Sequence, residues 1–145
     1  MAFRFSLATV LRFRESVERR EELALQKIIM EIARVRIEIE RLTGEIALAQ
    51  AAINKSLQKP ISAYHLQGLL NAANAIVDRK RALIESLAPL ERKRAAQMKA
   101  YQAAHRDRQM LSEMATRQRD VYELAQARAQ QKFLDDIFAS RAQRG

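Results

Sequence analysis

Apolar side chains recur every three or four residues along the first half of the chain. A strict repeat of about 3.5 residues places such side chains in one narrow stripe on a helix, which fits burial against one other helix but not a globular core. This pattern therefore predicts a helix that packs lengthwise against a partner helix. We call the nine positions the heptad seam: Leu25, Ile28, Ile32, Val35, Ile39, Leu42, Ile46, Ala49 and Ile53.

Two helix starts and one turn organise the chain. Ser6 is placed to cap a first helix and Ser62 a second one, and each follows an apolar residue that can pack one turn into its helix. Between them, Pro60 ends the first pattern. The sequence therefore predicts an all-α fold in which two long helices form an antiparallel coiled-coil hairpin. The expected ranges are about 6–57 for the first helix, 58–62 for the turn and 63–139 for the second helix, within one elongated domain of residues 1–145.

The second helix carries a looser stripe. Lys80, Arg94 and Arg108 occupy positions within it, where long cationic side chains can lie along the seam with their charges in water. Pro89 removes one backbone hydrogen bond, so a kink is expected there, but the stripe stays in step across it. The apolar members are Leu66, Leu69, Ala73, Ile76, Leu83, Leu87, Leu90, Tyr101, Leu111, Tyr122 and Ala125.

The second helix is expected to extend past the first. If the turn centres near Pro60, residue i of the first helix faces about residue 120 minus i of the second, which we call the hairpin rule. By this rule Met114–Ala139, about 39 Å of helix, has no partner in this chain. A lone helix in water gains little from apolar side chains, so this overhang predicts an outside partner or pairing with a second copy. Its apolar residues are Val121, Tyr122, Leu124, Phe133, Leu134, Ile137 and Phe138.

All five phenylalanines belong to the end where the two termini emerge: Phe3, Phe5, Phe13, Phe133 and Phe138. Aromatic residues are enriched at interfaces, so this end is a candidate contact site. For Phe5 and Phe13, the alternative is that they only staple the start of the first helix.

Composition and charge narrow the choice of partner. The chain has only 3 Gly and 2 Pro, no Cys and a net charge of +9. Residues 58–145 carry 16 basic and 9 acidic groups, and hence +7 of that charge. The basic triplets Arg79-Lys80-Arg81 and Arg92-Lys93-Arg94 encircle their helix, and no aromatic residues are interleaved for base stacking. A solvated helix that also suits an acidic protein partner is therefore favoured over nucleic-acid binding. Every apolar run is too short to cross a bilayer.

The sequence offers little chemistry for catalysis. A two-helix rod provides almost no concave pocket, there is no phosphate-binding Gly-rich loop, and His65 and His105 are forty residues apart and expected to be exposed. We therefore expect no enzyme, no cofactor and no catalytic or metal site. Asp135 and Asp136 lie between Leu134 and Ile137, which makes either a mixed patch for a basic partner surface or a solvated pair.

Two terminal motifs resemble the FliJ family of flagellar type III export proteins. They are Phe3-Arg4-Phe5-Ser6-Leu7-x-x-Val10-Leu11-x-x-Arg14-Glu15 and Gln131-Lys132-Phe133-Leu134-Asp135-Asp136 with Arg141 beyond. The resemblance implies a cytoplasmic, membrane-peripheral protein, monomeric or weakly dimeric when isolated, that acts as a stalk-like rod. It implies three partners: the hexameric export ATPase, the cytoplasmic domain of the export gate and export chaperones.

The same resemblance assigns contact residues. Those toward the ATPase are Phe3, Phe5, Leu7, Leu11, Arg14, Leu134, Asp135, Asp136 and Phe138, and those toward the gate are Tyr64, Leu69 and Leu70. Family members commonly have Asp-Glu where this chain has Asp135-Asp136, and Pro89 belongs to no family pattern. The alternatives are a basic coiled coil that binds nucleic acid or an anionic membrane surface, and a self-associating scaffold. Neither the sequence nor the resemblance separates a flagellar member from a virulence-system relative.

Overall fold

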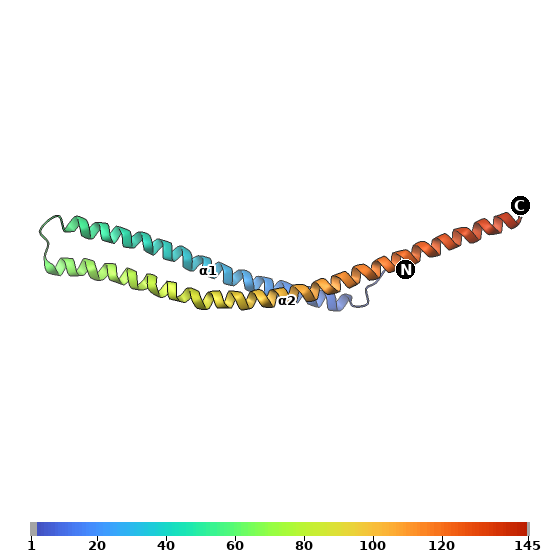
Figure 1. The fold of residues 1–145 in the computed structure, drawn as a ribbon, viewed down its shortest axis with the longest axis horizontal. Coiled ribbons are helices and arrows are strands. Elements are labelled where there is room, and N and C mark those ends of the chain that lie inside the picture. The colour runs from blue at the N-terminus through green and yellow to red at the C-terminus, as the bar shows by residue number, and fades with distance from the viewer. Residues whose placement is uncertain (1–2, 145) are drawn as a thin grey trace. The chain divides into compact units, whose positions relative to one another are not determined.

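Two helices make up nearly all of the described chain, residues 3–144 of the computed structural model. Helix α1 spans Ala8–Ser56 and helix α2 spans Ala63–Arg144 (Figure 1). No strand occurs anywhere between residues 3 and 144. The predicted all-α hairpin, with a longer second helix that overhangs the first, is confirmed.

The turn between the helices forms where the sequence predicts it, between the end of the first helix before Pro60 and the cap of the second helix at Ser62. Helix α1 ends in a tight turn, where the Gln58 N–H donates to the Lys55 carbonyl at 3.3 Å. Pro60 follows and cannot continue a helix. Ser62 then caps α2, because its Oγ accepts from the His65 N–H at 3.1 Å and its carbonyl accepts from the Leu66 N–H at 3.0 Å. The predicted Ser62 cap is confirmed.

The start of α1 differs from the prediction. The first helical hydrogen bond of α1 runs from the Leu11 N–H to the Leu7 carbonyl at 2.8 Å, so Leu7 and not Ser6 occupies the N-cap position. The Ala8 N–H donates instead to the Phe5 carbonyl at 3.1 Å. That turn redirects residues 3–7 before the helix begins, which takes Ser6 out of the capping position.

The contacts along the hairpin divide the chain into two compact units. One unit is Glu22–Ala100, which contains the turn and the flanking parts of both helices. The other unit joins Met1–Glu21 to Tyr101–Gly145. Each unit therefore contains a stretch of α1 and a stretch of α2, and each is described separately below.

The heptad seam forms the core of unit Glu22–Ala100. All nine of its side chains are buried or half-buried, and Leu42 is the most enclosed of them at 1% exposed. Across from them, Leu90 of α2 is buried as well. Because every seam position faces inward, the 3.5-residue period correctly identified the buried face.

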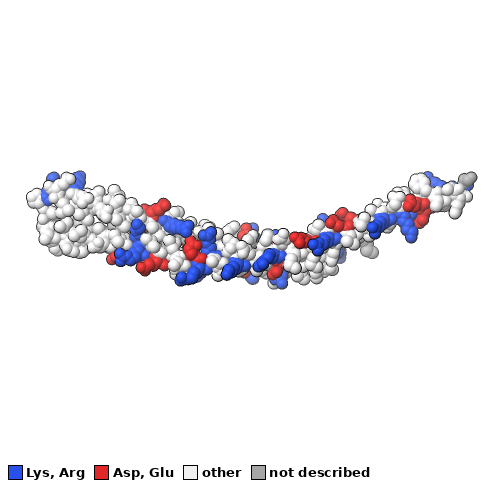
Figure 2. Space-filling view, viewed as in Figure 1, with Lys and Arg blue, Asp and Glu red and all other residues white. Residues whose placement is uncertain are grey.

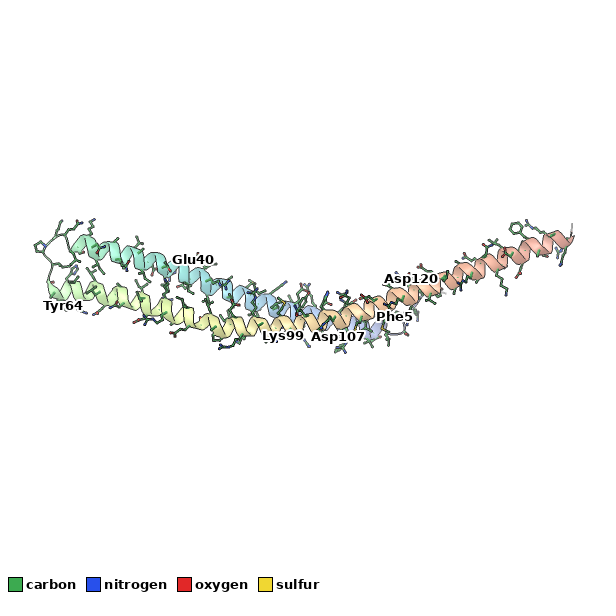
Figure 3. The ribbon with its side chains drawn as sticks, in the orientation of Figure 1. Phe5, Glu40, Tyr64, Lys99, Asp107 and Asp120 are labelled. Atoms are coloured by element: carbon green, nitrogen blue, oxygen red, sulfur yellow. The ribbon has the colours of Figure 1, made fainter. Side chains whose placement is uncertain are left out.

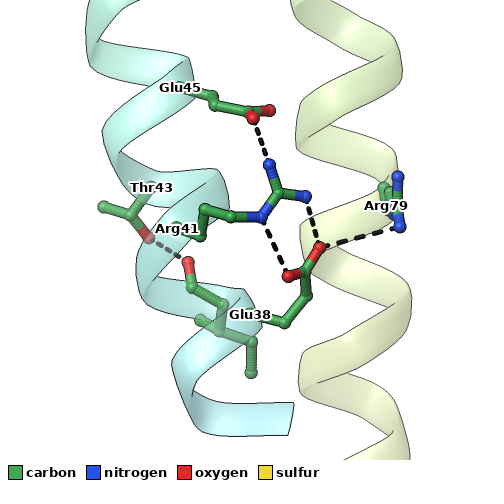
Figure 4. Close-up of polar contacts among 6 residues, drawn as sticks. Glu38, Arg41, Thr43, Glu45 and Arg79 are labelled. Atoms are coloured by element: carbon green, nitrogen blue, oxygen red, sulfur yellow. Dashed lines mark hydrogen bonds and ion pairs between the residues drawn. The ribbon is translucent and has the colours of Figure 1, made fainter. Parts of the chain in front are cut away.

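Ion pairs border this seam on the solvent side. Arg36 reaches Glu91 at 2.8 Å and Arg79 reaches Glu38 at 3.6 Å, so both pairs link α1 to α2. Within α1, Arg41 lies between Glu38 and Glu45, and its hydrogen bonds lower the pKa of Glu38 (Figure 4). Exposed pairs of this kind contribute little stability, so the seam carries most of the packing energy.

The stripe on α2 is also turned inward, although it is chemically mixed. Lys80, Arg94 and Arg108 are half-buried at seam positions, as the prediction required, whereas Ala125 is exposed. One buried member, Ala104, was missed because a single alanine between charged neighbours gives a weak apolar signal. Helix α2 runs on through Pro89, and the kink at that residue stays a prediction.

The heptad seam predicts that two leucines of α1, one inside it and one outside it, contribute very differently to the free energy of unfolding. Leu42→Ala should lower the free energy of unfolding by about 2–5 kcal/mol, because it empties a fully packed site. Leu48→Ala should change it by less than about 0.5 kcal/mol, because Leu48 is 72% exposed. Urea unfolding followed by circular dichroism measures both, and equal losses would contradict the assignment of the core.

Candidate partner-binding surfaces

The N-terminal residues pack back onto α2 in unit Met1–Glu21 with Tyr101–Gly145. The Phe3 ring lies 5.5 Å from the Tyr122 ring, and the Arg119 guanidinium lies 5.7 Å from the Phe3 ring centre. Figure 3 shows Phe5 beside the stretch of α2 that carries Asp107 and Asp120. The N-terminal segment therefore holds onto α2 by aromatic and cation–π contacts.

This packing shortens the overhang. The expectation that Met114–Ala139 has no partner in the chain is wrong for its first third, since Phe3 reaches Tyr122. The reason is that residues 3–5 precede the helix, and non-helical chain covers about 3.3 Å per residue against 1.5 Å in a helix. From residue 123 to residue 144, all side chains except that of Ile137 are exposed.

A cleft of about 370 Å³ lies between this segment and α2. Three of the ATPase-contact residues implied by the family resemblance, Phe3, Phe5 and Leu11, line it together. The remaining lining residues are Ala8, Ala115, Thr116 and Arg119. We call the space that these seven residues line the N-terminal cleft. The sequence reasoning missed the α2 residues, although the hairpin rule places residues 115–117 opposite residues 3–5.

Two further predicted contact residues lie beside the cleft but do not line it. Leu7 is exposed, and Arg14 forms an ion pair with Asp107 at 3.5 Å. The hairpin rule expects residue 106 opposite Arg14, so the observed pair supports the predicted register. Because Arg14 already has an anionic partner in this chain, a second anion would compete with Asp107.

A polar cluster fastens the beginning of α1 to α2. Glu18 accepts a hydrogen bond from Arg108 Nε at 2.5 Å, and its other oxygen lies 3.4 Å from His105 Nδ1. The hydrogen bond from Arg108 lowers the pKa of Glu18, against an opposing effect of burial. His105 is half-buried as a residue because position 105 borders the seam and faces Glu18, but 42% of its side chain is exposed, so the expectation that it is exposed holds only in part. His65 is exposed, as expected.

The other predicted ATPase-contact residues form a separate surface near the end of α2. Phe133 and Phe138 are each 65% exposed, and Leu134 is exposed beside them. Together with Ile137 they recur at helical spacing on one face, which we call the C-terminal patch. Asp135 and Asp136 are also exposed, and Asp135 accepts from Gln131 Nε2 at 3.0 Å. About 22 Å of helix separates Arg119 from Leu134, so the nine residues divide between two surfaces.

The hairpin tip, in unit Glu22–Ala100, is almost free of charge. Between Glu45 and Asp78 the only charged residues are Lys55 and Lys59, and Figure 2 shows this end of the hairpin nearly without blue or red. Of the predicted gate residues, Tyr64 is 91% exposed, Leu70 is exposed and Leu69 is half-buried. The gap in the charge pattern is visible in the sequence, but the sequence reasoning did not use it.

Residues 3–144 offer neither a metal-binding cluster nor a membrane-spanning helix. No group of three or more His, Asp or Glu residues among residues 3–144 is arranged to hold a metal ion. Neither helix, over the same residues, has a stretch both long and apolar enough to span a bilayer.

Comparison with known proteins gives a match to a protein family. The family model described as flagellar FliJ protein matches residues 3–145, nearly the whole chain. No curated protein and no solved structure matches. The matched range includes the N-terminal cleft, the C-terminal patch and the hairpin tip.

The Glu18 cluster predicts a pH-dependent contribution to stability. Because the pKa of Glu18 is lower in the folded chain than its ordinary value of 4.5, the contribution is complete above that value and is lost as the pH falls through the folded pKa. The Glu18→Gln variant should therefore have a lower free energy of unfolding than the native chain at pH 7. Below about pH 4 the two free energies should become similar. Glu31→Gln, which removes an exposed carboxylate, is the control; the same pH dependence in both variants would contradict the role of Glu18.

Proposed function

Because this chain belongs to the FliJ family, whose members are components of the flagellar export apparatus, we propose that it binds the hexameric export ATPase and promotes its activity. In this proposal the protein acts as a non-enzymatic, central-stalk-like element. It also contacts the cytoplasmic domain of the export gate or the substrate chaperones, and the chaperone contact rests on the family resemblance.

The observation that carries the proposal is the exposed aromatic end of α2. Residues 123–144 have almost no buried side chain, yet they include Phe133, Leu134 and Phe138. An isolated helix gains little from such residues in water, whereas each aromatic side chain buries about 150–250 Å² when it is covered. A protein partner that covers the C-terminal patch therefore explains why these residues are present.

The N-terminal cleft supplies a second contact in the same unit. Its walls are mostly apolar, and Arg119 places one cation at its edge. Such a cleft suits an apolar side chain of the ATPase with a carboxylate nearby. The C-terminal patch differs, because Asp135 and Asp136 border it, so we expect basic ATPase residues around that patch.

The hairpin tip is proposed as the surface for the export gate. Tyr64 is 91% exposed, and a Cβ added at Gly68, one turn further along α2, would meet open space. Tyr64, Leu69 and Gly68 are among the residues that line a shallow depression of about 330 Å³ in the nearly uncharged tip. Low charge reduces the cost of removing water when two surfaces meet, which favours contact here.

The ATPase contact is tested by adding the full chain to the cognate export ATPase and measuring ATP hydrolysis. We expect stimulation by the native chain and none after truncation following Ala129. The double variant Leu134→Gln with Phe138→Gln should lose most of the stimulation, because it makes the C-terminal patch polar while keeping the helix length.

The matched control is Ile84→Gln with Met110→Gln. Ile84 is 48% exposed and Met110 62% exposed on α2, and both lie outside residues 123–144 and outside the N-terminal cleft. This control should stimulate like the native chain. Equal stimulation by the truncated and full chains would contradict a role for the end of α2.

The gate contact is tested by calorimetric titration of the gate's cytoplasmic domain with the full chain. Tyr64→Ala with Leu70→Ala should weaken binding about tenfold or more, because it removes exposed apolar area at the tip. Ile84→Ala, an exposed apolar residue away from the tip, should leave it unchanged. If Tyr64→Ala with Leu70→Ala left the affinity unchanged while Ile84→Ala weakened it, the gate would contact a surface other than the hairpin tip.

A further inference from the structure

A second apolar stripe runs along the outside of α1 in unit Glu22–Ala100. Leu23, Met30 and Ile37 follow one another at seven-residue spacing, and they are 50%, 57% and 67% exposed. Each lies two residues before a member of the heptad seam. Two residues turn a helix by about 200°, so these side chains face away from α2. We call Leu23, Met30 and Ile37 the outer stripe.

The next position of the outer stripe is a glycine. Gly44 follows Ile37 by seven residues, and a Cβ built there meets nothing within 4 Å. Glycine inside a helix costs about 0.5–1 kcal/mol relative to alanine, and no neighbour in the chain requires its small size. Leu48 stands one turn further on and is the most exposed leucine of α1. The bare backbone at Gly44 would let another helix approach closely beside Leu48.

Basic side chains border the outer stripe along one edge. Lys27, Arg34 and Arg41 each follow a member of the stripe by four residues, which places them next to it on the helix surface. Arg41 is paired with Glu38 and Glu45, whereas Lys27 and Arg34 form no ion pair among residues 3–144. The opposite edge holds Gln26, Ala33 and Glu40. Two cations are therefore left to interact with a partner.

From this arrangement we propose that the outer stripe binds an amphipathic helix of another protein, with an apolar heptad stripe bordered by acidic residues. The seven-residue spacing matches the repeat of such a helix, and its carboxylates would pair with Lys27 and Arg34. A second copy of this chain fits less well. Its own outer stripe could offer those cations only one carboxylate, Glu40, and would bring two further cations to the interface.

The proposal can be tested with a synthetic peptide of four heptads that has Leu at positions a and d and Glu at positions e and g. A matched peptide with Lys at e and g is the charge control; repulsion between like charges keeps each peptide from pairing with itself. The full chain lacks Cys, so Ala33→Cys carries a unique fluorophore beside the outer stripe. We expect the Glu peptide to bind and the Lys peptide not to bind.

Two sets of variants locate the binding. Met30→Gln or Ile37→Gln should weaken binding of the Glu peptide about tenfold, and Lys27→Glu with Arg34→Glu should transfer the preference to the Lys peptide. Ile84→Gln, on α2, should change nothing. These substitutions are at exposed positions, so an unchanged circular dichroism melt confirms that the fold is kept.

Three results would overturn the proposal. The first is no binding of the Glu peptide, and the second is binding that is indifferent to Ile37→Gln and to the charge reversal. The third is a doubled mass of the peptide-free chain in light scattering that Ile37→Gln abolishes, because that result would assign the outer stripe to a second copy.

Discussion

The structure depends on the burial of one apolar stripe on α1 against α2. Leu25, Ile32 and Leu42 are the enclosed members of this seam, and every other seam position is at least half-buried. Among residues 3–144 no second layer of side chains lies behind them, so in this part of the chain each helix has a single buried face. Everything outside that face is in contact with water and is free to differ in charge, polarity and aromatic content. This freedom allows distinct surfaces to exist on so simple a fold.

Three surfaces differ from one another in their chemistry. The N-terminal cleft is apolar with one cation, the C-terminal patch is aromatic with two carboxylates, and the hairpin tip is almost uncharged. A partner that recognises one of them has no reason to bind another, because complementary charge and shape decide specificity. This separation would allow the proposed contacts with several export proteins to form independently of one another. The polar cluster around Glu18 serves a different purpose, since it fixes the beginning of α1 against α2.

The sequence was sufficient to predict the two-helix architecture, because the spacing of residues along a helix decides which face of the helix each side chain occupies. Nine positions read from Leu25 to Ile53 all face inward, and Ser62 caps the second helix as its position suggested. The parts that were missed depend on contacts between residues distant in sequence. Residues 3–7 fold back onto α2 and bring Arg119 to Phe3, and His105 meets Glu18, neither of which follows from local periodicity. The division of the predicted ATPase-contact residues into two surfaces, in contrast, already follows from the hairpin rule, which places residues 3–14 opposite residues 106–117 and far from Leu134.

Within residues 3–144, the end of α2 has almost no buried side chain, and the proposal is that the export ATPase covers it. Hydrogen–deuterium exchange of the full chain, alone and with the cognate ATPase, tests it most directly. In the free chain, amides of residues 123–144 should exchange much faster than those of the heptad seam, because no tertiary packing supports that stretch. Addition of the ATPase should slow exchange in residues 123–144. Slow exchange there in the free chain, or protection by the ATPase confined to other residues, would contradict the account.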